Sequence, residues 1–371
     1  MGEERLSLEN ISAKIKETGA KWLAAKTSVS ELSVEEQRNR LGLIPTSLEL
    51  QMITKLGLDK PIGASRKSSQ KSEKTNPGSV GLPTSIDWKN VNGVNWTTPI
   101  KNQGGCGSCV AFGTIAALEA LLKIRTYQDS NKVVDLSEAH LLWCGGGSCG
   151  GWHMNNACDY LKNNGTPDEA CFPYQAKTMS CANTCSDWKN RINYSKITNW
   201  TNTKDVNTMK NNLVNNGPQI TGMAVYNDFF SYKSGIYKHV TGGLAGYHCV
   251  AVVGYNDTDG YWICKNSWGT GWGENGWFRI AYGECGIQDV FGMWNMQVAP
   301  PVKACGYAQY LLVDYSFTSA ARVLWAYAGD AWRYKVISDA EVAGIAKLLM
   351  ESSKVYVCWE ENKLTFVRGF K

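Results

Sequence analysis

The sequence predicts an α+β fold in which a central domain of two lobes, one helical and one β-rich, is followed by a small α+β domain. Three observations predict this architecture. Apolar residues recur at helical spacing from Val110 to Tyr127, short β-type runs take over after Pro218, and segments unsuited to a core separate this middle part from both ends. At 371 residues the chain has room for more than one domain.

Residues 1–81 are expected to be separate from the central domain. Residues 1–60 are polar and helix-prone. Residues 63–81, GASRKSSQKSEKTNPGSVG, are rich in Lys, Ser and Gly and nearly free of apolar side chains. Such a composition cannot bury enough surface to offset the entropy lost on ordering the chain, so we expect a linker there.

The central domain is expected to cover residues 82–299 and to open at Leu82-Pro83. Its β-rich half contains the runs MAVY, GIYKHV, HCVAVVGY, YWICKNSW and GWFRIAY. Its helical half contains a regular apolar period at Ile115, Leu118, Leu121 and Leu122. This period places Cys109 at the N-terminus of a helix.

Residues 300–371 begin at a Pro-Pro pair and are expected to form the small C-terminal domain. The strand-like runs YLLVDYSF, RVLWAYA, VYVCWE and LTFVRGF surround one helical stretch, AEVAGIAKLLME. This alternation predicts an α+β module. No motif in it indicates a function, so we treat it as an accessory domain.

The overall composition excludes two classes of partner. The net charge of +5 is small for this length and the basic residues do not gather on one element, which argues against nucleic-acid binding. No stretch reaches the roughly 18 apolar residues that a membrane span needs. We therefore expect a globular protein, monomeric and without a membrane span.

The chain has 13 cysteines, which cluster between Cys106 and Cys185 and indicate disulfides and an oxidising compartment. The alternative is a cytosolic protein with buried thiols. The N-terminus, MGEERLSLEN, has acidic residues where a signal peptide has a basic and then an apolar region. Either the protein is cytosolic or the numbering starts after a removed export signal, and the cysteines favour a secreted or extracytoplasmic location.

Cys106 and Cys109 form a C-x-x-C motif that allows three interpretations. A zinc site would need two further ligands, and the segment lacks a compact knuckle. A thioredoxin-like redox pair would follow a strand in a βαβ unit, and WTTPIKNQGG is a poor strand. In the third interpretation Cys109 is a nucleophile, since a helix N-terminus favours a thiolate, and Cys106 forms a disulfide.

A nucleophilic cysteine needs a histidine base and a group that orients it. The chain has four histidines. We expect His140 to be buried in a helix, His239 to lie at the surface and His153 to lie in a loop. His248 begins an apolar strand, and the segment KNSWGTGWGENGW follows it, with Asn266 as the candidate orienting group and Trp268 as a hydrophobic shield.

Taken together, QGGCGSCVAF, GYHCVAVVGY and KNSWGTGWGENGW resemble the papain family of cysteine peptidases over about residues 82–295. GIYKHVTGGLAGYHCVAVVGY is similar to the cathepsin B branch. The resemblance implies a papain-like two-lobe fold, with a helical lobe and a β-barrel-like lobe. It also implies hydrolysis of polypeptide substrates with no cofactor and no metal.

The resemblance assigns roles to four residues. Cys109 attacks the scissile carbonyl as a thiolate paired with protonated His248, which then protonates the leaving amine. Asn266 fixes the imidazole ring. Gln103 contributes its side-chain amide to the oxyanion hole beside the backbone N–H of Cys109.

The substrate-binding residues follow from the same resemblance. The family's C-N-G-G loop corresponds to a sequence ending in Gly151 and Trp152, so a bulky ring stands where the family has glycine and is expected to narrow the cleft. The P2 subsite is expected to prefer a bulky apolar residue and to be lined by Met154, Gly222, Gly246 and Val290. Val290 stands where cathepsin B has an acidic residue, so the tolerance of that branch for arginine at P2 is expected to be lost. The histidine-bearing occluding loop that makes cathepsin B an exopeptidase is not present in the sequence, so we expect an endopeptidase.

The family pattern implies the disulfides Cys106–Cys149 and Cys144–Cys181, and we add Cys171–Cys185 as a third pair. The remaining cysteines of the central domain other than Cys109 fall in apolar runs and are expected to be buried thiols: Cys158, Cys249, Cys264 and Cys285. We also expect Cys305 and Cys358 to pair within the C-terminal domain.

By position, residues 1–81 correspond to a propeptide and activation linker. We expect this segment to inhibit the enzyme by lying in the cleft until the linker is cut. Two alternatives belong to other classes. One is a catalytically silent papain-fold binding protein, and the other is a transferase of transglutaminase type, which typically has Asp in place of Asn266.

Overall fold

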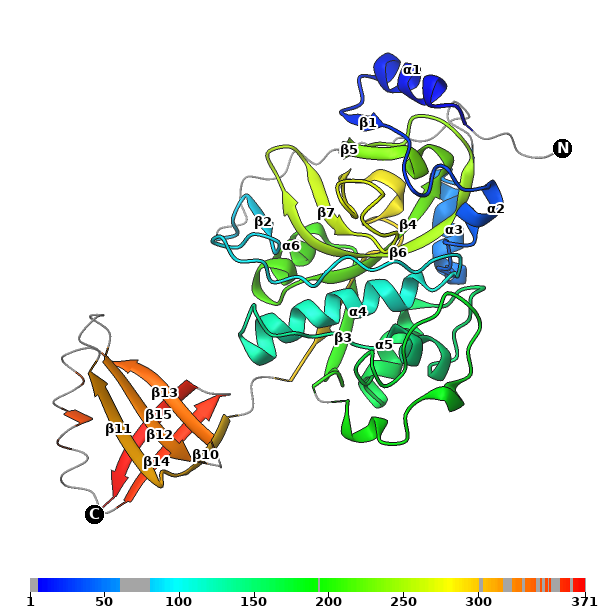
Figure 1. Ribbon diagram of the computed structural model, residues 1–371. Helices are drawn as coiled ribbons and strands as arrows, with labels where there is room; N and C mark the ends of the chain where they lie inside the picture. The colour runs from blue at the N-terminus through cyan, green and yellow to red at the C-terminus, as the bar shows by residue number, and fades with distance from the viewer. Residues whose placement is uncertain are drawn as a thin grey trace. The chain divides into compact units, whose positions relative to one another are not determined.

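The computed structural model describes residues 6–60, 81–192, 194–299 and, further on, 303–315, 322–328, 331–337, 341, 344, 345, 347, 354–360 and 363–370 (Figure 1). The expected linker at 63–81 lies outside the described residues except for Gly81. The chain divides into two compact units, Met1–Ala299 and Pro300–Lys371. No helix within the described part of the chain is long and apolar enough to cross a bilayer.

A nine-stranded sheet forms the β-rich lobe of the first unit, in the order β1-β5-β8-β7-β6-β4-β9-β3, with β2 pairing β6. All pairs are antiparallel except β5 with β8. The strands are β1 (Trp22–Ala24), β2 (Ser85–Asp87), β3 (Asn199–Thr203), β4 (Gln219–Tyr226), β5 (Tyr232–Tyr237), β6 (Leu244–Asn256), β7 (Tyr261–Lys265), β8 (Trp277–Ala281) and β9 (Met293–Gln297).

Six α-helices accompany this sheet within the described residues of the first unit. They are α1 (Leu8–Thr18), α2 (Val34–Arg38), α3 (Ser47–Leu56), α4 (Cys109–Leu121), α5 (Met154–Asn163) and α6 (Val206–Asn215). The predicted helix over 110–127 is confirmed, with its last six residues wound as a π-helix. Helices α2 and α3 begin with capping boxes, in which Ser33 pairs with Glu36 and Thr46 with Glu49.

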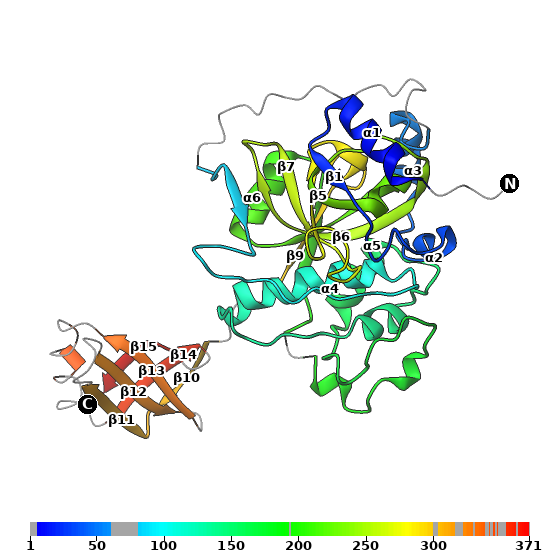
Figure 2. The same cartoon turned by 45° about the horizontal axis from the view of Figure 1, so that its top comes forward.

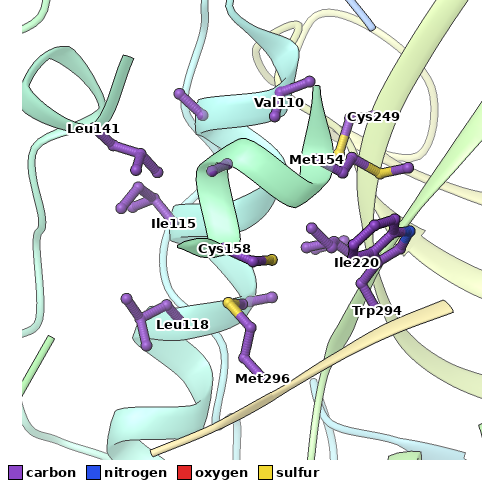
Figure 3. Close-up of a cluster of buried hydrophobic side chains, with 14 of the residues drawn as sticks. Val110, Ile115, Leu118, Leu141, Met154, Cys158, Ile220, Cys249, Trp294 and Met296 are labelled. Carbon is purple, nitrogen blue, oxygen red and sulfur yellow. The ribbon is translucent and has the colours of Figure 1, made fainter. Parts of the chain in front are cut away.

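The helix α4 is buried along almost its entire length because both lobes pack on it. Figure 3 shows Val110, Ile115 and Leu118 of α4 among side chains from α5, β4, β6 and β9. A helix buried all round needs no amphipathic pattern, and the segment is apolar except for Thr114 and Glu119, which are also buried. This packing fixes the start of α4, and therefore Cys109, relative to strand β6.

Three disulfides are present as expected: Cys106–Cys149, Cys144–Cys181 and Cys171–Cys185. All of them lie in the helical lobe, where long irregular segments connect short helices. Cys158, Cys249, Cys264 and Cys285 are buried, also as expected, and lie outside these disulfides.

The N-terminal residues 6–60 pack against the β-rich lobe. Strand β1 pairs with β5 and extends the sheet by one strand, and Trp22 is buried against Tyr232 and Tyr237. Figure 2 shows α1 and β1 beside this sheet edge. Beyond β1, the Thr27 hydroxyl donates to the Phe230 carbonyl at 2.7 Å. The polar N-terminal part therefore shares a core with the domain that follows it.

The second unit contains a six-stranded sheet in the order β10-β14-β15-β13-β12-β11. Ala308 donates from its backbone to Val355 of β14 and the next residue, Gln309, to Tyr327 of β12, so the chain passes directly from one sheet edge to the other. The described residues of the predicted helix, 341, 344, 345 and 347, are helical. The strands are β10 (Lys303–Tyr307), β11 (Tyr310–Tyr315), β12 (Arg322–Ala328), β13 (Ala331–Ile337), β14 (Lys354–Glu360) and β15 (Lys363–Phe370).

We predict that Cys305 and Cys358 form a disulfide, because they are direct Cα partners in the antiparallel pair β10–β14. Alkylating the unfolded, unreduced protein with iodoacetamide should then add five groups, one on each cysteine of the first unit that lies outside its disulfides. Intact mass spectrometry counts them. Two further groups would contradict the pairing, and Cys305→Ser should add a single group, on Cys358.

Candidate active site

Cys109 is the first residue of α4 and is completely buried. The loop before it is held by the disulfide Cys106–Cys149 and by a 2.9 Å bond from the Gly107 N–H to the Cys149 carbonyl. At the helix start, backbone N–H groups point toward the sulfur and favour a negative charge there. The sequence therefore predicted the position of this thiol correctly.

His248 lies on β6, and its Nε2 is 2.8 Å from Asn266 Oδ1. The Ser267 N–H also donates to that oxygen at 2.8 Å, so the oxygen is an acceptor and the imidazole must carry its proton on Nε2. Nδ1 is left with a lone pair and makes no hydrogen bond to any described residue. Trp268 packs on the imidazole at 4.8 Å and is itself buried, which shields the His248–Asn266 bond from water.

The two elements that carry Cys109 and His248 are in direct contact. Helix α4 packs on β6, and a Cβ at Gly113 of α4 would lie 3.0 Å from the sulfur of Cys249. The backbone of Cys249, the residue after His248, hydrogen-bonds to the Cys109 sulfur and acts to lower the pKa of that thiol. The structure thus brings together a cysteine and a histidine that lie 139 positions apart in the sequence.

Gln103 is buried and held on both sides of its side-chain amide. Its Oε1 accepts from the Ser267 hydroxyl at 2.6 Å, and its Nε2 donates to the Cys106 carbonyl at 2.8 Å. The second Nε2 hydrogen points to the Arg40 carbonyl oxygen at 3.0 Å. A fixed amide donor aimed at a carbonyl oxygen, close to a thiol, has the arrangement of an oxyanion-hole donor.

Residues 40–44 pass through this site. While the Arg40 carbonyl accepts from Gln103, the Gly42 N–H donates to the Cys109 sulfur at 3.3 Å. A Cβ on Gly42 would overlap the Gly107 carbonyl oxygen, so only glycine allows the backbone to approach this closely. The N-terminal segment therefore contacts both the candidate nucleophile and the candidate oxyanion donor.

The same segment pairs with the loop that carries Trp152. The Trp152 N–H donates to the Gly42 carbonyl at 2.8 Å, and the Ile44 N–H donates to the Trp152 carbonyl at 2.9 Å. These bonds form a parallel bridge between Leu43 and Trp152. On its other side, the Leu43 N–H donates to the Tyr247 carbonyl at 3.2 Å.

The Trp152 ring does not lie in the cleft, contrary to the expectation that it narrows it. The ring is turned into the helical lobe, where it is 3% exposed and packs against the backbone at Gly145 and Gly147. Its backbone N–H and carbonyl remain available on the cleft side. Gly151 is required next to it, since its φ is +120° and a Cβ there would lie 2.5 Å from the Gly42 carbonyl oxygen.

Leu43 packs among residues that the sequence assigns to the P2 subsite. A Cβ at Gly222 would lie 2.5 Å from Leu43 Cδ2 and 2.6 Å from the ring of Phe291. Met154 and Val290 belong to the same buried apolar cluster as Leu43. Gly246 instead faces Leu41, at 3.0 Å from its would-be Cβ. Sequence reasoning missed Phe291, for which no motif exists, although it directly follows Val290.

Burial of the covered site favours the neutral forms of both catalytic candidates. Desolvation raises the pKa of the Cys109 thiol to about 11, although neighbouring backbone hydrogen bonds act in the opposite direction. Desolvation likewise lowers the pKa of His248 to about 4, although its hydrogen bond to Asn266, and also the backbone of Arg40, act in the opposite direction. At neutral pH the covered site therefore holds a thiol and a neutral imidazole rather than an ion pair.

A network of buried charged residues lies next to the loop that carries Asn266. This network was not identified from the sequence. Lys101 Nζ lies 2.8 Å from a carboxylate oxygen of Glu138, which is almost completely buried. Lys265, the residue before Asn266, donates to the Thr98 carbonyl at 2.7 Å. These bonds satisfy charged groups that would otherwise be costly to bury.

The expectation that His239 lies at the surface is wrong. His239 is 5% exposed, its Nδ1 is 3.0 Å from Asp228 Oδ1, and its ring stacks on Tyr226 at 3.7 Å. Asp228 also accepts from the Tyr237 hydroxyl at 2.7 Å and from the Val240 N–H at 2.8 Å. The segment folds inward because this buried carboxylate needs several donors. His140 is buried as expected.

Residues 82–293 match the family model of the papain family cysteine proteases, and the chain belongs to that family. It is similar to the cathepsin B-like protein CP2 of Giardia intestinalis, with 34% identity over 202 residues, covering 51% of this chain and 67% of that protein. It is also similar to cathepsin S of Bos taurus, with 37% identity over 218 residues, covering 56% of this chain and 63% of that protein.

Solved structures of precursors resemble the fold. Procathepsin B S9 from Trypanosoma congolense aligns with a TM-score of 0.62 at 25% identity, over 80% of this chain and 99% of that chain. Digestive procathepsin L2 from the larval midgut of Tenebrio molitor aligns with a TM-score of 0.61 at 27% identity, over 78% and 88%. The protein is therefore a papain-family cysteine peptidase, a hydrolase, with the fold of propeptide-bearing relatives.

We predict that Cys109 in the uncleaved chain reacts slowly with iodoacetamide at pH 6–8. Because its pKa is raised to about 11, the reactive thiolate is scarce below that value and should increase about tenfold per pH unit as the pH rises toward it. Alkylation rates between pH 6 and 10, read by peptide mass spectrometry, test this. A rate independent of pH would contradict it, and Cys109→Ser provides the background from the other thiols.

Proposed function

We propose that this chain is the precursor of a secreted cysteine endopeptidase. In it, Cys109 is the nucleophile, His248 the general acid and base, Asn266 the orienting group and Gln103 an oxyanion donor. We further propose that residues 1–81 are a propeptide that inhibits the enzyme. One observation carries the proposal: the backbone of residues 40–42 contacts Gln103 and Cys109 at once, as an inhibitory peptide in an active site would.

The proposed chemistry begins with proton transfer from the Cys109 thiol to His248 Nδ1, the nitrogen that Asn266 leaves without a proton. The thiolate then attacks a peptide carbonyl carbon, and the oxygen takes negative charge while it accepts from Gln103 Nε2. The imidazolium next protonates the departing amine, which leaves an acyl-enzyme. Finally His248 removes a proton from water, which attacks the acyl carbon and restores the thiol.

The Arg40 carbonyl supports the oxyanion assignment. Its oxygen is 3.0 Å from Gln103 Nε2, within the range that oxyanion donors use. Loss of one such donor typically costs about 3 kcal/mol of transition-state stabilisation. We therefore expect Gln103 to act on kcat rather than on substrate binding.

The inhibitory segment escapes cleavage, in this proposal, because of what it presents to the sulfur. An amide N–H, that of Gly42, faces Cys109 at 3.3 Å, whereas attack requires a carbonyl carbon at about that distance. The N–H also holds a sulfur lone pair in a hydrogen bond. The segment therefore binds as a substrate would without offering the atom that reacts.

Two features support a preference for a bulky apolar residue at P2. Leu43 fills the space beside Gly222, and this space is lined by the apolar cluster that contains Met154, Val290 and Phe291. Burying one leucine-sized side chain contributes roughly 1.5–3 kcal/mol. A cationic P2 side chain would find no carboxylate at Val290, which matches the expected loss of arginine tolerance.

Three disulfides in the helical lobe support a location outside the cytosol. The chain between Gly165 and Cys181 contains no histidine, which supports endopeptidase rather than exopeptidase action. For the unit from Pro300 onward we propose only an accessory role.

We predict that the wild-type chain, held at about pH 4–5 with a mild thiol, loses roughly its first 65–82 residues, while Cys109→Ala stays intact. Only the wild type has the sulfur needed for acyl-enzyme formation. Intact mass over time measures the loss. If both chains stay intact, and the externally trimmed wild type has no peptidase activity, the silent binding protein becomes the better interpretation. Trimming of both chains would point to a contaminating protease.

We predict that Gly42→Ala weakens inhibition and accelerates self-processing at least tenfold at neutral pH. The added Cβ would overlap the Gly107 carbonyl, so the segment must move away from Cys109. The half-life of the full-length chain on gels measures the effect. Gly243→Ala is the matched control, because a Cβ there meets no atom within 4 Å. Equal half-lives for the two variants would contradict a tight fit at Gly42.

A further inference from the structure

Tyr174 joins the two ends of the loop that carries the proposed oxyanion donors. Its hydroxyl donates to the Gln103 carbonyl oxygen at 2.8 Å and lies 2.7 Å from the Ser108 Oγ. Gln103 supplies the side-chain donor, and Ser108 immediately precedes Cys109, whose N–H is the proposed second donor. One hydroxyl therefore contacts both residues on which the spacing of these donors depends.

Counting protons fixes the direction of these bonds. The Tyr174 hydroxyl has one hydrogen, and it goes to the Gln103 carbonyl, which can only accept. The Ser108 hydroxyl then donates to the Tyr174 oxygen, which at 2.7 Å is closer than its other acceptor, the Cys106 carbonyl at 3.3 Å. The result is a chain from Ser108 through Tyr174 to Gln103, in which each bond polarises the next.

Tyr174 is itself held rigidly, which a positioning residue needs to be. Its N–H donates to the Glu169 carboxylate at 2.6 Å. Its ring meets Phe112 of α4 edge-on, with centroids 4.8 Å apart, and lies 5.7 Å from Trp143. The nearby disulfide Cys171–Cys185 ties down the segment from which it projects. Tyr174 thus fixes the loop from Gln103 to Ser108 relative to helix α4, because it contacts both.

The bond from Tyr174 acts on the main-chain carbonyl of Gln103, the one polar group of this residue that has no other hydrogen-bond partner among the described residues. Ser267 fixes the side-chain oxygen of Gln103, and the Ser267 carbonyl accepts from the Gln103 N–H at 2.9 Å. The Gln103 carbonyl is the remaining polar group, and it accepts from Tyr174. The peptide plane between Gln103 and Gly104 is held at one edge by the Gly104 N–H, which donates to Asn102 Oδ1 at 3.0 Å. Without the Tyr174 bond the plane loses its second hydrogen bond, and Gly104, at φ +63°, does not resist a tilt of the plane through a side chain.

We propose that Tyr174 is a positioning residue for peptide hydrolysis, which sets the spacing between Gln103 Nε2 and the Cys109 N–H. This proposal rests on the function proposed above. It goes beyond it because Tyr174 touches neither the substrate nor the reacting atoms and acts through Gln103 and Ser108. Its hydroxyl affects the stabilisation of the oxyanion, while its ring serves packing.

The experiment compares the wild type, Tyr174→Phe, Gln103→Ala and the double variant. Each full-length chain is activated by limited trypsin cleavage within residues 61–80, which contain an arginine and several lysines, and its active sites are titrated with an epoxide. Rates are then measured on a peptide substrate with Leu at P2. Tyr174→Phe keeps the ring and its contacts with Phe112 and removes only the hydroxyl.

We expect Tyr174→Phe to lower kcat roughly 5- to 20-fold with KM changed less than about twofold, a part of the loss typical of a whole oxyanion donor. In the Gln103→Ala background the same change should lower kcat less than about twofold, because there is no longer a side-chain donor to position. Tyr282→Phe is the matched control. It removes a hydroxyl that donates to Asp257 at 2.7 Å, and kcat should not change.

The outcomes separate this proposal from the one on which it rests. If Gln103→Ala lowers kcat but Tyr174→Phe has no effect, or the same effect in both backgrounds, the role of Tyr174 is overturned and the proposed active site stands. If Gln103→Ala leaves kcat unchanged, the oxyanion assignment fails, and the role of Tyr174 fails with it. A loss of thermal stability in Tyr174→Phe without the kcat coupling would identify a purely structural tyrosine.

Discussion

The burial of α4 between the two lobes is the constraint on which the rest of the first unit depends. A largely apolar helix that is buried on all sides is stable only when both lobes cover it, so its N-terminus must emerge where they meet. Cys109 therefore lies next to β6 without any interaction dedicated to placing it there. The disulfide Cys106–Cys149 then fixes the preceding loop, where the chain turns back toward Gln103.

The same burial explains how inhibition and protonation are linked. While residues 40–44 cover the site, both Cys109 and His248 are fully buried, and burial disfavours a charged form of either group. An ion pair is stabilised only where water or fixed dipoles solvate the charges. In the proposed function, the covering segment thus blocks the cleft sterically and also keeps the Cys109 thiol protonated. Its departure would remove both obstacles in one step.

Much of the site could be predicted from sequence because the family resemblance rests on contiguous motifs. Cys109, Gln103, His248 and Asn266 each lie in such a motif, and two of the disulfides follow the family pattern. Phe291 and Tyr174 could not be predicted, since their importance arises from contacts with residues distant in the sequence. The position of His239 was predicted wrongly for the same reason: the buried carboxylate of Asp228 lies 11 residues away and no motif joins them.

Trp152 illustrates how a site tolerates a change at a position where the family has glycine. The cleft uses the backbone N–H and carbonyl of that residue, which any amino acid supplies. The indole ring packs instead against Gly145 and Gly147. A Cβ would lie 2.4 Å from the ring at Gly145 and 3.0 Å from it at Gly147. Two glycines in the lobe behind the cleft, Gly145 and Gly147, thereby make room for the indole ring. Because residue 152 contacts the N-terminal segment through main-chain atoms, packing of the side chain decides which residue type fits at this position.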